Sequence, residues 1–272
     1  MRYFICLSYN GSAFCGWQIQ ENANSVQAEL QKALATLLKE PVSVTGAGRT
    51  DSGVNAFNYI AHFDCQIIVQ DVNHLLYKLN AILPKEICIN NIFSVDANAH
   101  ARFDAIERTY KYFIHTKKDP FNSNFSYYLP PDRLNFEKMN TAAKYFLGEQ
   151  DFTSLEKLNG GNKTSICNVT EAFWAPVNAF PNFATYNSAN DTVYTANNFA
   201  KSSHFVFTVT ANRFLRNMVR AMVGSLLDVG TGKHSPEWIA QMLAQKNRSS
   251  AGHSVPGNAL FLYKIEYPTS KK

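Results

Sequence analysis

The residues best suited to chemistry lie in the glycine-rich stretch 46–53, whose sequence is GAGRTDSG. It places one guanidinium, Arg49, two residues before one carboxylate, Asp51. Glycines permit positive φ and let a backbone approach a ligand closely. The pattern fits neither the G-x-G-x-x-G of a dinucleotide site nor the G-K-[ST] of a P-loop. The stretch is therefore either a loop that contacts a ligand or a glycine turn with a local Arg–Asp pair.

Three arginines recur in the segment that is predicted to form a helix over 213–228. Arg213, Arg216 and Arg220 are spaced i, i+3, i+7, which on a helix places them within an arc of about 60°. Like charges on one helical face repel by a few tenths of a kcal/mol per pair, and the first acid in this segment is Asp228. The spacing predicts an anionic partner, a carboxylate or phosphates, unless this face is simply solvated.

A third candidate is the predicted strand 107–115, which contains the sequence RTYKYF. Strand alternation puts Arg108, Tyr110 and Tyr112 on one face. Tyrosines beside basic residues can stack on unpaired bases, as on RNA-binding sheets. A strand tyrosine is also commonly a core residue with its hydroxyl bonded, so this strand alone favours neither interpretation.

The composition is that of an ordinary globular protein of 272 residues. The 26 Lys+Arg and 21 Asp+Glu give a net charge of +5, and 17% of residues are charged, which excludes a basic tail and an acidic disordered chain. The cysteines and histidines are scattered without metal-ligand spacing. No apolar run approaches the roughly 18 residues of a membrane span, and residues 1–8 predict a strand rather than a signal peptide. We expect a cytoplasmic protein without a metal or a membrane anchor.

The elements that must position these residues alternate in a regular order. In the first half we expect a strand at 2–9, a helix at 24–39 capped by Asn24, strands at 42–45 and 57–65, a helix at 71–81 and a strand at 86–95. This β-α-β-β-α-β order is typical of a split βαβ, or ferredoxin-like, module with an antiparallel sheet.

The second half repeats this order with two additions. We expect a strand at 107–115, a helix at 136–147, strands at 166–177 and 203–210, a helix at 213–228 and a strand at 260–267; the additions are a surface loop at 178–202 and a helix at 235–244. The fold class is therefore α+β, with two ferredoxin-like modules. Residues 1–105 form a module with the Asp loop, and residues 106–272 form one with the Tyr strand and the Arg helix.

Several motifs occur together in a familiar sequence order. They are YNGSAFCGWQIQ, SVQAEL, GRTDSGV, RTYKY, GEQDFTSL and NRFLRNMVRAMVGSLLDVG. In this combination the chain resembles the tRNA pseudouridine synthase A family, from Tyr9 to about Pro268. The resemblance implies isomerisation of uridine to pseudouridine at positions 38, 39 and 40 of the tRNA anticodon stem-loop. It further implies a homodimer that needs neither metal nor organic cofactor, with two α/β modules meeting at a basic cleft.

The resemblance also implies roles for individual residues. Asp51 matches the essential aspartate, Arg220 the arginine that pairs with it, and Tyr110 the tyrosine that packs on the target base. Arg49 matches the arginine that helps to extrude the base. We further expect Arg108, Arg213 and Arg216 to contact the RNA and Leu260 to line the uracil pocket.

Two segments depart from the family pattern. The usual GVHA is GVNA here, so that Asn55 replaces a histidine. The usual AGPTAPAxGL is AGHSVPGNALFL over 251–262.

Two other classes of function remain to be weighed against a synthase. A non-catalytic tandem RNA-binding module would use the same basic residues and tyrosines, but a carboxylate such as Asp51 among arginines would repel phosphates. A glycosidase also acts at an anomeric carbon, but it generally needs two carboxylates flanking the bond, and the GRTD loop offers one.

Overall fold

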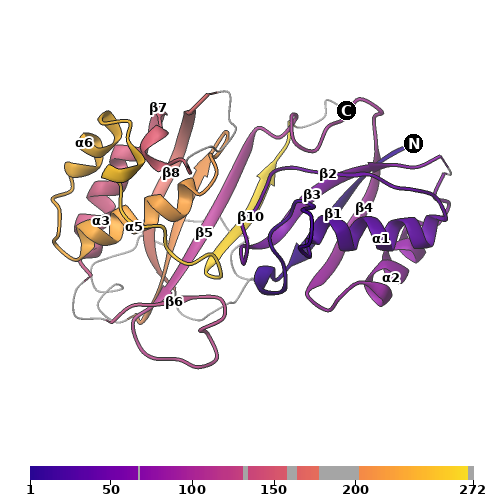
Figure 1. Cartoon of the computed structure of the whole chain (residues 1–272), viewed down its shortest axis with the longest axis horizontal. Helices are drawn as coiled ribbons and strands as arrows, with labels where there is room; N and C mark the ends of the chain where they lie inside the picture. Colours follow the sequence, from indigo (N-terminus) through magenta and orange to yellow (C-terminus); the bar gives the residue numbers. More distant parts are fainter. Residues whose placement is uncertain (67, 131–133, 158–163, 178–201, 269–272) are drawn as a thin grey trace. The chain divides into compact units, whose positions relative to one another are not determined.

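The structure is a computed structural model that describes residues 1–66, 68–130, 134–157, 164–177 and 202–268 (Figure 1). The chain separates into two compact units. The first unit comprises Met1–Tyr110 and Phe261–Lys272, and the second comprises Lys111–Leu260. Most of the predicted loop 178–202 lies outside the described residues. The predicted second module, 106–272, includes the C-terminal segment that the structure groups with the first unit.

The first unit contains helices and strands in the predicted β-α-β-β-α-β order. They are β1 (Arg2–Tyr9), α1 (Val26–Leu38), β2 (Val44–Gly46), β3 (Asn55–Asp64), α2 (Val72–Ile82) and β4 (Ile87–Val95). The strand order is β4-β1-β3-β10, where β10 is Leu260–Glu266, and β2 pairs with β3. The described pairs are antiparallel except for β10, which runs parallel to β3. The expectation of a wholly antiparallel sheet is therefore wrong at this strand.

Both helices of the first unit cover the same face of its sheet (Figure 1). Alternate residues of β1 are buried on this face, and one apolar side of each helix packs against them, as expected for an amphipathic helix. The core residues include Tyr3, Ile5 and Leu7 from β1, Leu30 and Leu34 from α1, and Leu75 and Leu79 from α2. Helix α1 is capped by Ser25, whose hydroxyl accepts the N–H of Ala28 at 3.2 Å, and not by Asn24 as predicted.

The second unit consists of strands and of helices that pack together. Its elements are β5 (Glu107–His115, which begins in the first unit), β6 (Tyr127–Tyr128), α3 (Phe136–Ala143), β7 (Gly148–Asp151), β8 (Ile166–Val177), β9 (His204–Ala211), α5 (Met218–Gly230) and α6 (Trp238–Ala244). The strand order is β5-β9-β8-β7, and β6 runs parallel to β5. The short strands β6 and β7 were not predicted, because two to four residues carry too little periodicity.

Helix α5 begins five residues later than the sequence predicts. Asn217 directly before it has φ of +69°, in the left-handed region, which a right-handed helix cannot include. Arg213 and Arg216 consequently precede the helix, and only Arg220 is part of it. The predicted face of three arginines on one helix is therefore wrong. Most residues of α5 itself are buried, including the predicted core residues Met218 and Met222.

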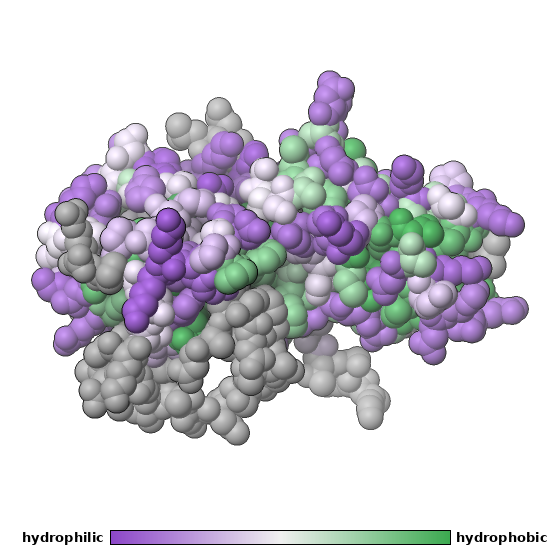
Figure 2. All heavy atoms as spheres, turned by 90° about the horizontal axis from the view of Figure 1, so that it is seen from below, coloured by the Kyte–Doolittle hydropathy of each residue, from purple (hydrophilic) through white to green (hydrophobic). Residues whose placement is uncertain are grey.

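The surface shown in Figure 2 is largely hydrophilic, with one area of hydrophobic side chains at its right-hand part. In Figure 1 the right-hand part is occupied by the first unit. Separately, the exposed large side chains of α2 include Ile82 (48%) and Tyr77 (70%). Scattered exposed apolar residues are normal for globular proteins and do not by themselves indicate a binding site. Among the described residues, no helix is long and apolar enough to span a membrane.

Candidate active site

Asp51 lies in the loop that connects β2 to β3 in the first unit, and it is half-buried. A turn closes directly after it, since the backbone N–H of Val54 donates to the Asp51 carbonyl at 3.1 Å. The carboxylate is thus carried by a hydrogen-bonded turn at the start of a buried strand. This arrangement fixes the backbone of the residue while leaving part of it accessible.

The residue before Asp51 anchors the loop to the segment that follows β1. Thr50 is buried, its Oγ1 lies 2.8 Å from the Tyr9 hydroxyl, and its carbonyl accepts the N–H of Trp17 at 3.2 Å. Gly16 has φ of +95°, and a Cβ there would come within 2.4 Å of the Thr50 carbonyl oxygen. Only glycine permits this approach. The N-terminal YNGSAFCGW motif therefore serves as the scaffold of the Asp51 loop.

Asn55, which replaces the usual histidine, has a structural role in this scaffold. Its side chain is buried (1% exposed), and its Oδ1 accepts the backbone N–H of Gly11 at 2.9 Å. The side-chain amide therefore connects the first residue of β3 to the turn after β1. The departure from the family pattern is accommodated by a hydrogen bond that a short polar side chain can make.

Arg108 supports the same loop from β5. Its Nη2 donates to the carbonyls of Arg102 at 2.7 Å and Ala47 at 3.3 Å, and its Nη1 donates to that of Ala105 at 2.7 Å. The side chain thereby ties the start of the glycine-rich loop to the chain before β5. This structural role was not anticipated from the sequence, where Arg108 was expected to contact RNA.

Tyr110 lies two residues further along β5 and packs against the core of the first unit. Burial raises the pKa of its hydroxyl to about 12; the Arg108 guanidinium opposes this shift, and the Asp51 carboxylate adds to it. The phenol therefore stays protonated at neutral pH. In the first unit, Asp51 and Arg108 therefore lie close enough to Tyr110 for their charges to act on its hydroxyl.

Arg49 is exposed on the loop, next to Gly48. The backbone of Gly48 is held by Tyr59, whose hydroxyl donates to the Gly48 carbonyl and accepts its N–H. The backbone under Arg49 is thus fixed while its side chain reaches solvent. An exposed cation on a fixed loop suits contact with a phosphate or a base.

Arg220 lies on α5 in the second unit and is half-buried. Its Nε donates to the carbonyl of Val255 at 2.6 Å, and the N–H of Val255 donates back to the Arg220 carbonyl at 3.3 Å. The Nε bond orients the guanidinium toward Val255, and the backbone bond attaches Val255 to α5. Arg216 is exposed before the helix, Arg213 is half-buried, and Leu260 is buried at the start of β10.

Nothing in the described part of the chain forms a group of three or more metal-binding side chains. The five cysteines are free thiols that do not pair with one another.

Comparison with known proteins decides the family. A model of the tRNA pseudouridine synthase family matches residues 142–268. Proteins named tRNA pseudouridine synthase A from Parabacteroides distasonis and Bacteroides fragilis are each 46% identical over 267 residues, covering 98% of this chain and 96% of the relative. The Bacillus subtilis protein of that name is 35% identical over 271 residues, covering 98% and 99%. The chain belongs to the tRNA pseudouridine synthase A family.

Membership of the tRNA pseudouridine synthase A family confirms the resemblance that the sequence motifs indicate. Within this member, the motif residues fall into two groups. Asp51, Arg49, Arg108 and Tyr110 belong to the first unit, whereas Arg213, Arg216, Arg220 and Leu260 belong to the second.

Sequence reasoning missed the residues that support those side chains. Thr50 stands beside Asp51 in the motif, but its buried hydroxyl gave no signal in the sequence. Among residues other than glycine, asparagine is one of the types that most often adopt the left-handed conformation, so Asn217 before an apolar run was a usable signal for the start of α5.

Proposed function

We propose that this protein converts uridine to pseudouridine in tRNA, at positions 38, 39 and 40 of the anticodon stem-loop. The observation that carries the proposal is the 46% identity, over 98% of the chain, to proteins named tRNA pseudouridine synthase A. The protein is thus an isomerase that acts on tRNA. The anchored Asp51 loop supports the same conclusion, since it holds one carboxylate on a fixed backbone.

The reaction needs one ionised carboxylate. The bond between ribose C1′ and uracil N1 breaks, the base turns, and a bond forms between C1′ and C5; the proton on C5 leaves and N1 gains one. No electrons are exchanged with a partner. Asp51 initiates the reaction, either by nucleophilic attack or by removing a ribose proton.

Arg220 is the cation that we assign to the Asp51 carboxylate during the reaction. An arginine within about 4–6 Å favours the ionised form of a carboxylate, and it can hold both oxygens. The contact of the Arg220 Nε with the Val255 carbonyl supports this role, because it fixes the direction of the side chain.

Tyr110 is the residue that we assign to stacking on the target base. Extruding a base from its stack costs a few kcal/mol, which an aromatic ring can offset by stacking on the base. Because its phenol stays protonated at neutral pH, Tyr110 presents a neutral ring. Arg49 assists the extrusion from its exposed position on the loop.

The remaining candidate residues are assigned to contacts with the RNA or to support of the loop. We assign Arg213 and Arg216 to phosphates and Leu260 to the uracil ring. Arg108 adds positive charge at the Asp51 loop, and its described hydrogen bonds to backbone carbonyls favour a supporting role.

The architecture that we propose is a pair of ferredoxin-like α+β modules flanking a basic cleft, assembled as a homodimer. The β-α-β-β-α-β order of the first unit supports the module.

Release of tritium from tRNA labelled at uridine C5 tests the proposal. Wild-type protein should release tritium, because the C5 proton leaves in the reaction. The Asp51→Asn variant keeps the size of the side chain and removes its charge, so it should release none above background while binding tRNA nearly as tightly as wild type.

The matched control is Asp96→Asn, an exposed carboxylate in the same unit, which should behave as wild type. Tritium release by Asp51→Asn at the wild-type rate would contradict the assignment. If the wild-type protein binds tRNA and releases no tritium, the non-catalytic RNA-binding module becomes the better description.

A further inference from the structure

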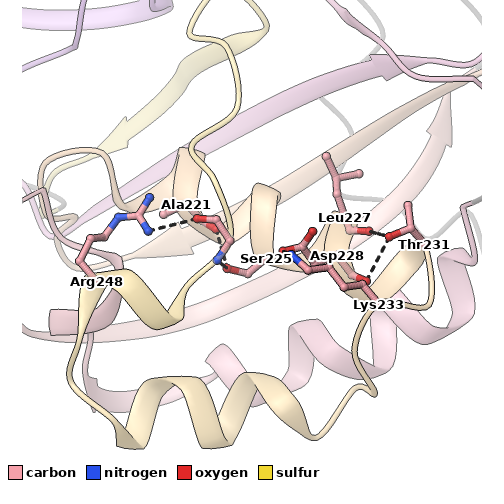
Figure 3. Close-up of polar contacts among 8 residues, drawn as sticks. Ala221, Ser225, Leu227, Asp228, Thr231, Lys233 and Arg248 are labelled. Atoms are coloured by element: carbon pink, nitrogen blue, oxygen red, sulfur yellow. Dashed lines mark hydrogen bonds and ion pairs between the residues drawn. The ribbon is translucent and has the colours of Figure 1, made fainter.

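Residues 252–256 lie directly against helix α5, and backbone atoms of the segment contact backbone atoms of the helix. A Cβ added to Gly224 of α5 would come within 1.8 Å of the carbonyl oxygen of His253, which no real side chain tolerates. From the other side, the N–H of Gly252 donates to the buried hydroxyl of Ser225 at 3.0 Å. Ser225 in turn donates to the Ala221 carbonyl at 2.9 Å (Figure 3). The segment is therefore tightly fitted to the helix that carries Arg220.

A second arginine, Arg248, also makes hydrogen bonds to residues 252–256 (Figure 3). Its Nη1 donates to the carbonyl of Gly252 at 3.1 Å and its Nη2 to the hydroxyl of Ser254 at 2.9 Å. The guanidinium thus bridges two residues of the segment with two separate nitrogens. The planar guanidinium presents two nitrogens at a fixed separation to the two acceptors, whereas a lysine ammonium offers its donors from a single atom.

Asn217, directly before α5, also bonds to this segment. We call Arg248 and Asn217, which together hold residues 252–256, the clamp. Its Nδ2 donates to the same Ser254 hydroxyl at 2.6 Å. Ser254 is therefore held by Arg248 and by the residue whose left-handed conformation sets where the helix begins. The left-handed Asn217 thus has a second function, which is to attach the segment to the helix.

The clamped segment is also bonded to Arg220. Val255 follows Ser254 directly, and its carbonyl accepts the Nε of Arg220 at 2.6 Å while its N–H donates to the Arg220 carbonyl. A displacement of Ser254 would therefore move the acceptor that sets the orientation of the Arg220 guanidinium. Below the segment, the buried Tyr112 donates its hydroxyl to the Pro256 carbonyl at 3.0 Å, which fixes the other end.

We propose that Arg248 is a positioning residue for catalysis, which acts through Gly252, Ser254 and Val255 to hold the Arg220 guanidinium in its working orientation. This inference rests on the proposed role of Arg220 in pseudouridine formation. In this role Arg248 acts through the orientation of Arg220 and not on the substrate itself. A misplacement of about 1 Å in a catalytic group can cost on the order of 100-fold in rate, so the clamp matters for turnover more than for binding.

The Arg248→Lys variant tests this role because it keeps the charge and loses the two separated nitrogens. We expect the kcat for tritium release from C5-labelled tRNA to fall about 10- to 100-fold, with KM and the dissociation constant for tRNA changed less than about 2-fold. A phosphate-binding role for Arg248 predicts the opposite pattern: lysine would retain kcat, and any defect would lie in tRNA affinity. That result would overturn the proposal.

A double-mutant cycle separates positioning from general damage to the fold. In an Arg220→Ala background, measured by single turnover with excess enzyme, adding Arg248→Lys should change the rate less than about 2-fold, because the residue it positions is absent. A full additional loss in that background would contradict the proposal. If the wild-type protein releases no tritium, the proposed function itself fails, which is a distinct outcome.

The matched control lies at the other end of α5. Lys233 is exposed and pairs with Asp228 at 3.2 Å (Figure 3). Lys233→Met removes a cation near the same helix without touching residues 252–256, and it should leave kcat unchanged. Equal losses in Lys233→Met and Arg248→Lys would also overturn the proposal.

Discussion

At the scale of single residues, the candidate site depends on side chains that carry no chemistry of their own. Thr50 anchors the backbone beneath Asp51, and Asn55 connects β3 to the turn after β1 through a buried hydrogen bond. A buried donor that loses its partner costs about 1–3 kcal/mol, more than most exposed contacts contribute. Replacing these supports should therefore affect stability even where the catalytic groups remain.

Asn55→Ala provides the test at this scale. The substitution removes the acceptor of the Gly11 N–H in a buried site, so the free energy of unfolding should fall by about 1–3 kcal/mol. Urea denaturation followed by circular dichroism measures the change. Asn98→Ala, at an exposed turn, should change stability by less than about 0.5 kcal/mol. An equal effect of both substitutions would refute the structural role of Asn55.

At the scale of elements, β3 connects the Asp51 loop to the chain that leads into β5. His62 of β3 is buried, and its Nδ1 accepts the N–H of Ala101 at 3.1 Å. Burial, assisted by the charges of Arg2 and His100, lowers the pKa of His62 to about 4. The folded state therefore binds its proton more weakly than the unfolded chain, whose pKa is near 6.5.

The sign of this difference gives a pH dependence. Below pH 6.5 the unfolded chain takes up a proton at His62 that the folded protein does not, so stability is complete above pH 6.5 and is lost as pH falls toward 4. The titration of His62 alone should lower the free energy of unfolding by about 2 kcal/mol between pH 7 and pH 5. His62→Gln should flatten the dependence of the unfolding free energy on pH over that range, whereas His74→Gln, at an exposed position on α2, should not.

The segment that precedes α5 supplies a second prediction for elements. Arg216 is exposed there, outside the helix, and we assign it to a tRNA phosphate. Arg216→Ala should make the plot of log affinity for tRNA against log salt concentration less steep, by about one unit of slope for the lost phosphate contact. The kcat should stay close to that of the wild type. Lys78→Ala on α2 is the comparison, since its exposed cation lies outside the family's motifs. An unchanged slope for Arg216→Ala would show that Arg216 is a solvated surface residue that does not contact a phosphate.

At the scale of the whole molecule, the sequence predicted the order of most elements because their periodicity is strong. Strands 107–115 and 166–177 were predicted with the bounds of β5 and β8. The start of α5 was missed, because a helical pattern of apolar residues continues through Asn217, whose backbone conformation periodicity does not report. The parallel pairing of β10 with β3 joins residues about 200 positions apart, which no local pattern encodes.

For the candidate site, the sequence supplied the residues that carry the motifs but not the residues that hold them. Asp51, Tyr110 and Arg220 were named from the family resemblance. The clamp of Arg248 and Asn217 on residues 252–256 was not, since it depends on three segments that meet only in the fold.

The most direct test is a map of pseudouridines in tRNA from cells that lack this protein. We predict that pseudouridine disappears from positions 38, 39 and 40, that the wild-type chain restores it, and that Asp51→Asn expressed at the same level does not. Pseudouridine that persists at these positions without the protein, or that Asp51→Asn restores, would contradict the central claim that the Asp51 loop of this chain modifies the anticodon stem-loop.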